Sequence, residues 1–165
     1  MKTPSDKSPK KTIKKPKPKA YPVLNEGVSS IISEPLALYV PNSFERLSTI
    51  RSGIPYAALE TISQKLNQPI KAILELFDIP QTTYNKKKGE QALLGTRDSE
   101  IVLLITELLA YGKQVFNQEE AKLQRWLKKP NAALAGHTPE SMLDTSTGIA
   151  EVRHCLDKIE YGNFA

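Results

Sequence analysis

The sequence predicts an all-α fold, and two observations lead to this fold class. Apolar residues recur at helical spacing in several successive segments between Pro55 and Tyr161, and prolines punctuate these segments. No segment shows a convincing strand pattern, in which apolar and polar residues alternate. The chain has 165 residues, of which 39% are hydrophobic, so it can form one ordinary domain or two small ones.

Residues 1–20 are predicted to be a disordered tail rich in lysine and proline. They contain eight lysines, four prolines, one acid and a single large aliphatic residue, Ile13. Such a stretch cannot bury enough apolar surface to offset its conformational entropy. The tail carries a charge of +7, whereas the remaining residues carry −2, so the chain is basic only because of its tail. Its lysines could add non-specific contacts with phosphates.

Residues 21–50 are weakly patterned and contain prolines at positions 22, 35 and 41, so we expect a linker or arm that packs on later helices. A short helix from about Ser43 to Ile50 would place Phe44, Leu47 and Ile50 on one face.

Three short helices are expected next. In the first, Pro55 would take the first helical position, and Leu59, Ile62 and Leu66 share a face. A second helix starts at Pro69. After a tight break at residues 78–80, a third helix follows over residues 81–88, and this helix is polar and basic. Two short helices joined in this way are typical of a helix-turn-helix.

The third helix carries side chains suited to DNA. Glutamine and asparagine can read adenine edges, while lysine and threonine can reach phosphates. A solvated polar helix is the alternative interpretation. The candidate DNA-binding residues are Gln81, Thr82, Thr83, Asn85, Lys86, Lys87 and Lys88.

One long helix is predicted from Thr96 to Phe116. Its segment Ile101–Leu109 is apolar nearly all round, so we expect it at the centre of the fold or of a dimer. Because this segment is too apolar for the surface of a small monomer, a homodimer is the expected state.

Three further helices are expected towards the end of the chain. Asn117 and Glu120 resemble a capping box that opens a helix ending before Pro130. A short helix starts at Thr138-Pro139. The last helix runs from about Gly148 to Tyr161, with Gly162 as its C-cap.

No enzyme is predicted. His154 and Cys155 are adjacent on a helix and therefore poorly placed as a nucleophile–base pair, and His137 lies in a loop. No metal site and no cofactor are expected, because no residues have zinc-ligand spacing and no glycine loop could cradle a phosphate. One cysteine fits a reducing compartment, and no apolar stretch is long enough to span a bilayer, so a cytoplasmic protein without membrane contact is expected.

The C-terminal residues resemble the toxin-binding domain of the Xre/ParS/MbcA-type antitoxins, which belong to RES–Xre type II toxin–antitoxin pairs. Three runs carry the resemblance: W-L-x-x-P-N-x-A-L-x-G-x-T-P at Trp126–Pro139, L-x-T-x-x-G at Leu143–Gly148, and V-x-x-x-L-x-x-I-E-x-G-x-F-A at Val152–Ala165. Residues from Arg51 to Phe116 resemble the Xre-like helix-turn-helix half of that family more weakly.

The resemblance implies a helix-turn-helix and dimerisation domain at 51–116 and a toxin-binding domain at 117–165. It implies an antitoxin that blocks the active site of a RES-domain toxin, which would consume NAD or transfer ADP-ribose, and that represses its own promoter by binding operator DNA. Residues expected to contact the toxin are Val152, Leu156, Ile159, Tyr161, Gly162, Asn163, Phe164 and Ala165. Residues expected to shape the toxin-binding domain are Trp126, Pro130, Asn131, Leu134, Gly136, Pro139 and Gly148.

Two other functions remain open from the sequence. One is a DNA-binding transcriptional regulator whose C-terminal block serves only dimerisation. The other is an adaptor with a degenerate helix-turn-helix.

Overall fold

The computed structural model describes residues 43–162. The predictions for the tail at 1–20, for residues 21–42 of the linker, and for Asn163, Phe164 and Ala165 lie outside these described residues. Within residues 43–162 the fold class is confirmed: the secondary structure is helical, apart from one isolated bridge between Pro55 and Leu93. The elements in chain order are α1 (Ser43–Ser52), α2 (Ala58–Leu66), α3 (Ile70–Leu76), α4 (Gln81–Gly89), α5 (Thr96–Val115), α6 (Glu120–Lys128), the 3-10 helices η1 (Ala132–Leu134) and η2 (Pro139–Met142), and α7 (Ser146–Tyr161).

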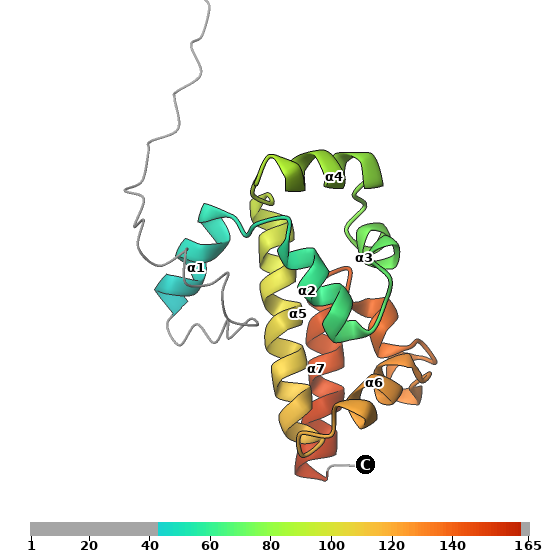
Figure 1. The fold of residues 1–165 in the computed structure, drawn as a ribbon. Helices are drawn as coiled ribbons and strands as arrows, with labels where there is room; N and C mark the ends of the chain where they lie inside the picture. The colour runs from blue at the N-terminus through green and yellow to red at the C-terminus, as the bar shows by residue number, and fades with distance from the viewer. Residues whose placement is uncertain (1–42, 163–165) are drawn as a thin grey trace, which may run out of the picture.

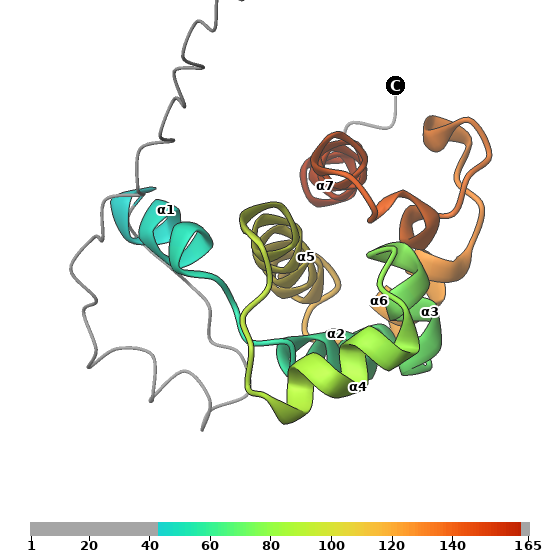
Figure 2. The same ribbon diagram turned by 90° about the horizontal axis from the view of Figure 1, so that it is seen from above.

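The long helix α5 is the centre of the fold. It packs against α1, α2, α6 and α7, so its apolar residues are covered on several sides (Figures 1 and 2). Leu103 and Ile105 have no exposed surface, and even the polar Ser99 and Thr106 are buried. The expectation of a dimer rested on the apolar character of this helix. That argument does not hold, because one chain supplies the burial by itself.

Helix α1 forms where a short helix was predicted and extends to Ser52. The three residues expected on one face of this helix are not all buried. Ile50 is 9% exposed and joins the core, whereas Phe44 is 82% and Leu47 is 42% exposed.

Helices α2, α3 and α4 follow in close succession. Leu59, Ile62 and Leu66 of α2 are buried as predicted. The prediction that Pro55 takes the first position of α2 is wrong, because the helix begins at Ala58. Pro55 instead bridges to Leu93, and this pairing holds the segment before α2 against the segment before α5.

The junction between α5 and α6 contradicts the predicted capping box. Asn117 and Gln118 have positive φ angles of 53° and 65°. Their N–H groups donate to carbonyls of Gln114 and Lys113, at 2.9 and 2.8 Å, so the two residues close the end of α5. Glu119 is the N-cap of α6 and makes no capping bond with its side chain. The tight reversal of the chain takes Asn117 out of the conformation that a capping box needs.

The C-terminal elements form a compact unit beside α5. Helix α6 packs on η2, and both 3-10 helices pack on α7. The start of η2 at Pro139 is confirmed, and the Thr138 hydroxyl caps it by accepting from Ser141 N. Helix α7 begins two residues earlier than predicted, with the Thr145 hydroxyl accepting from Gly148 N, and Gly162 ends it in the left-handed conformation as predicted.

Helix α6 also touches the first half of the fold. The Gln124 side chain donates to the Lys65 carbonyl, and Lys128 Nζ donates to the Asn67 carbonyl at 3.2 Å. None of the helices that the structure describes is long and apolar enough to cross a membrane.

Candidate functional site

Helix α4 is anchored to the core by one aromatic side chain. Tyr84 is 3% exposed, and its ring centroid lies 6.5 Å from that of Tyr56. Burial, together with the Glu60 carboxylate, raises the pKa of Tyr84 to about 12. Because Tyr84 is buried, it fixes which side of α4 faces outward. Of the predicted DNA-binding residues, Gln81, Thr82, Thr83, Asn85, Lys86 and Lys88 are exposed, and Lys87 is half-buried.

Two amide side chains on the surface of α4 are hydrogen-bonded to each other. Gln81 Nε2 donates to Asn85 Oδ1 at 3.1 Å, one helical turn along. This leaves Gln81 Oε1 as an acceptor and the Asn85 amide as a donor. An acceptor and a donor side by side complement the N6 and N7 edge of adenine.

The lysines of α4 differ in their surroundings. Lys88 Nζ makes an ion pair and a hydrogen bond with the Glu60 carboxylate of α2. Lys87 Nζ lies 3.7 Å from Glu90 Oε2. Among the described residues, Lys86 makes no ion pair. The surface of α4 is therefore less positive than its three consecutive lysines suggest. Sequence reasoning missed the partner of Lys88, because Glu60 is 28 residues away and no local pattern indicates the contact.

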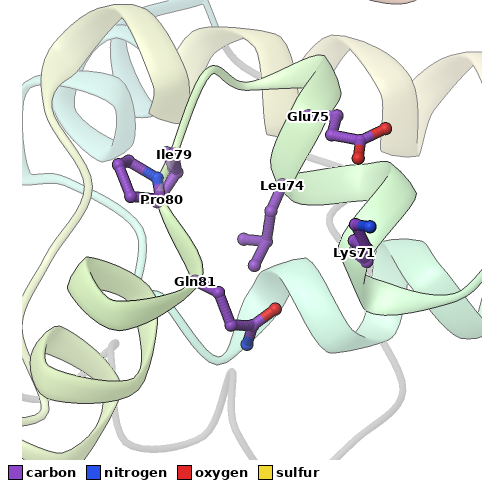
Figure 3. Close-up of a pocket in the computed structure, with 6 residues that line it drawn as sticks. All are labelled: Lys71, Leu74, Glu75, Ile79, Pro80 and Gln81. Carbon is purple, nitrogen blue, oxygen red and sulfur yellow. The ribbon is translucent and has the colours of Figure 1, made fainter.

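A small pocket of about 200 Å³ lies at the turn between α3 and α4. Figure 3 shows Lys71, Leu74 and Glu75 on α3, Ile79 and Pro80 on the turn, and Gln81 at the start of α4. The apolar lining borders the exposed amide of Gln81, so this part of the surface can accept a small apolar group beside a hydrogen-bonding group.

The predicted toxin-binding residues divide into buried and exposed sets. Val152 and Leu156 have no exposed surface, so their side chains cannot contact a partner directly in this conformation. They hold α7 in the core instead. Ile159 is half-buried, whereas Tyr161 is 73% exposed beside the exposed Gly162, which turns the chain with φ 67°.

The residues predicted to shape the C-terminal unit play different structural parts. Leu134, Pro139 and Gly148 are buried. Trp126 is half-buried, with its ring centroid 5.9 Å from that of Phe116. The loop from Asn131 to Gly136 closes on itself.

Asn131 organises that loop. Its Oδ1 accepts from Ala133 N at 2.9 Å, and its carbonyl accepts from Gly136 N at 2.9 Å. Gly136 adopts φ 85°, which costs glycine little, and Pro130 is exposed at the loop entrance.

A polar contact that the sequence did not reveal joins α5 and α7. The Tyr111 hydroxyl donates to Asp157 Oδ1 at 2.7 Å, and the Arg153 guanidinium lies 4.5 Å from the Tyr111 ring centroid. The hydrogen bond to Asp157 raises the pKa of Tyr111 to about 12. This contact fixes the register of α7 along α5.

The groups considered for catalysis are not brought together as a reactive pair. Cys155 is buried, and burial raises the pKa of its thiol. His154 is exposed, with Nδ1 3.8 Å from Glu151 Oε2. No cluster of histidine, cysteine and carboxylate groups within residues 43–162 could hold a metal ion.

The fold therefore defines a helical protein with a helix-turn-helix, α3–α4, and a small C-terminal helical unit on the same central helix. Both the helix-turn-helix and the C-terminal unit match domains of known protein families. Residues 45–106 match the antitoxin Xre-like helix-turn-helix domain, and residues 112–162 match the antitoxin Xre/MbcA/ParS C-terminal toxin-binding domain. Both matched domains are those of Xre-type antitoxins, and together they account for most of the described residues.

Individual relatives agree with this assignment. The chain is 29% identical to the Prs ADP-ribosylating antitoxin of Sphingobium sp. (strain YBL2), over 78% of this chain and 86% of that protein. It is 25% identical to the antitoxin Xre of Photorhabdus laumondii, over 68% and 76% of the two chains. It is 22% identical to the antitoxin Xre of Yersinia enterocolitica, over 72% and 80%.

Proposed function

We propose that this antitoxin neutralises a cognate RES-domain toxin by blocking its NAD-consuming or ADP-ribosylating active site, and that it represses its own promoter as a dimer. It acts by binding and not as an enzyme. The observation that carries the proposal is the C-terminal unit matched at residues 112–162, which packs on the central helix α5.

The arrangement of the two surfaces supports two simultaneous activities. Figure 1 shows α4 near one end of α5 and the carboxyl end of α7 near the other. Tyr161 and Gly162 are exposed at that second end. A toxin bound there would leave α4 accessible to operator DNA.

The support for a RES-domain partner comes from family resemblance together with the name of one relative, which refers to ADP-ribosylation. A toxin of this kind must bind NAD, so its cleft must accept an anionic phosphate group. We propose that Asn163, Phe164 and Ala165, which follow Gly162, enter this cleft and that the Phe164 ring fills an apolar part of it.

Co-expression with the cognate RES-domain protein tests the main proposal. Cells that express both chains should grow, the two proteins should co-purify, and NAD in extracts should stay at the level of cells without toxin. If the two proteins do not associate and NAD falls as fast as with toxin alone, this toxin is not the partner.

Removal of Asn163–Ala165 tests how inhibition occurs. The truncated chain keeps the α7 surface, so it should still bind the toxin, although more weakly. It should no longer protect cells or stop NAD consumption, because these residues are proposed to occupy the cleft. Full neutralisation by the truncated chain would instead assign inhibition to the described part of the C-terminal unit.

The alternative, a transcriptional regulator whose C-terminal block only dimerises, makes a different prediction. Deletion of residues 117–165 would then abolish both self-association and promoter binding, and the full chain would protect cells from no toxin.

A further inference from the structure

Glu60 is the residue outside α4 that makes the closest contact with its lysines. It lies on α2, and its carboxylate accepts a hydrogen bond from Lys88 Nζ. The two side chains are 44% and 40% exposed, respectively, so the pair lies at the surface where a ligand of α4 can reach it. The contact joins residues 28 positions apart and so depends on the fold itself.

The fold holds Lys88 towards Glu60 in a second way. Tyr84 is buried one helical turn before Lys88, and Lys88 Nζ lies 6.0 Å from the centroid of its ring. Since Tyr84 fixes the rotation of α4, Lys88 leaves the helix on the side that faces α2. The ion pair is therefore a consequence of how α4 is seated.

Glu60 also stays charged under ordinary conditions. The hydrogen bond from Lys88 lowers the pKa of the Glu60 carboxyl, so the carboxylate persists at neutral pH. A carboxylate beside the lysines of a DNA-binding helix has two effects. It competes with phosphate for the ammonium group, and it repels the phosphate backbone.

We propose that Glu60 limits the affinity of α4 for DNA by holding Lys88 away from backbone phosphates. The inference rests on the proposed binding of operator DNA by α4, and it adds a residue of α2 that sets the strength of that binding.

The substitution Glu60→Gln tests the proposal, because it keeps the shape of the side chain and removes its charge. Binding to the promoter duplex and to a duplex of unrelated sequence would be measured by fluorescence anisotropy over a series of salt concentrations. Since a surface ion pair contributes little free energy, Glu60→Gln should tighten binding about two- to fivefold. The slope of log affinity against log salt should steepen by about one, because one more lysine releases counterions.

Glu119→Gln is the matched control. It removes the same charge from another exposed pair, in which Lys122 Nζ lies 2.5 Å from Glu119 Oε1, at the start of α6. This variant should bind DNA like the original chain. The double variant Glu60→Gln with Lys88→Ala should lose most of the gain, because the effect passes through Lys88.

The outcomes separate the two proposals. If the original chain binds its promoter and Glu60→Gln binds no better, the inference about Glu60 is wrong and DNA binding stands. If the gain persists without Lys88, Glu60 acts as a distant charge and the inference is also overturned. If neither the original chain nor Glu60→Gln binds any duplex, DNA binding by α4 fails and the inference fails with it.

Discussion

Gly148 lies directly against the backbone carbonyl of Met142, where η2 ends and the chain turns into α7. A Cβ at Gly148 would be 2.1 Å from the Met142 oxygen and 3.0 Å from Thr145 Oγ1. Neither neighbour can move easily, since one is backbone and the other is the cap that accepts from Gly148 N. The seating of α7 on η2 therefore depends on a residue without a side chain.

Gly148→Ala should destabilise the protein by about 3 kcal/mol, at the upper end of overpacking costs. Urea unfolding followed by circular dichroism measures the change. Gly89→Ala is the matched control, because a Cβ at Gly89 meets no atom within 4 Å and the residue lies at the end of α4. Equal stability of the two variants would show that η2 and α7 are packed differently.

Trp126→Ala should destabilise the C-terminal unit by about 2 kcal/mol, less than the roughly 3–5 kcal/mol of a fully buried tryptophan, because Trp126 is half-buried. The lost contact is the ring packing on Phe116. Trp126→Phe should restore most of it, since it keeps an aromatic ring. Urea unfolding of both variants tests this, and a loss as large for phenylalanine as for alanine would contradict a packing role.

Stability should fall at alkaline pH because of two tyrosines. Burial raises the pKa of Tyr84 from 10.0 to about 12. The hydrogen bond to Asp157 raises the pKa of Tyr111 from 10.0 to about 12. A group whose pKa is higher in the folded state stabilises that state fully below its unfolded pKa. The contribution is therefore complete below pH 10 and is lost as the pH rises through about 12.

Thermal unfolding between these pH values measures the effect. Tyr111→Phe should make the loss of stability with rising pH less steep, because it removes one of the two tyrosine hydroxyls. Asp157→Asn should do the same, since it removes the carboxylate that raises the pKa of Tyr111. A decline that is unchanged in both variants would mean that the Tyr111–Asp157 hydrogen bond is not formed in solution.

The helices could be predicted because their signals are local. The spacing of Leu59, Ile62 and Leu66 indicated α2, and the break at residues 78–80 indicated the turn before α4. Gly162 marked the end of α7 for a similar reason, since glycine tolerates the left-handed conformation that closes a helix.

The features that the sequence could not reveal depend on residues far apart in the chain. An apolar helix looks the same in sequence whether a second chain or the same chain covers it, so Ile101–Leu109 suggested a dimer that burial does not require. Asn117 had the composition of a cap, but the reversal between α5 and α6 gave it a positive φ. Lys88 looked available because its partner, Glu60, is far away in the chain.

The replacement of Lys86, Lys87 and Lys88 together by alanine should abolish promoter binding and leave toxin neutralisation intact. All three lie on α4, whereas Tyr161 and Gly162 lie at the C-terminal end of α7. Figure 1 shows α4 and this end of α7 near opposite ends of α5. Among the single variants, the loss of DNA affinity should be largest for the lysine that has no ion-pair partner. Lys86→Ala should lose most affinity, since Lys86 makes no ion pair within residues 43–162, whereas Lys88 already pairs with Glu60. Anisotropy with the promoter duplex gives the ranking, and protection of toxin-expressing cells gives the second readout. A triple variant that binds its promoter with unchanged affinity would place the DNA contact on another helix, and one that also fails to protect cells would show that the two surfaces are not independent.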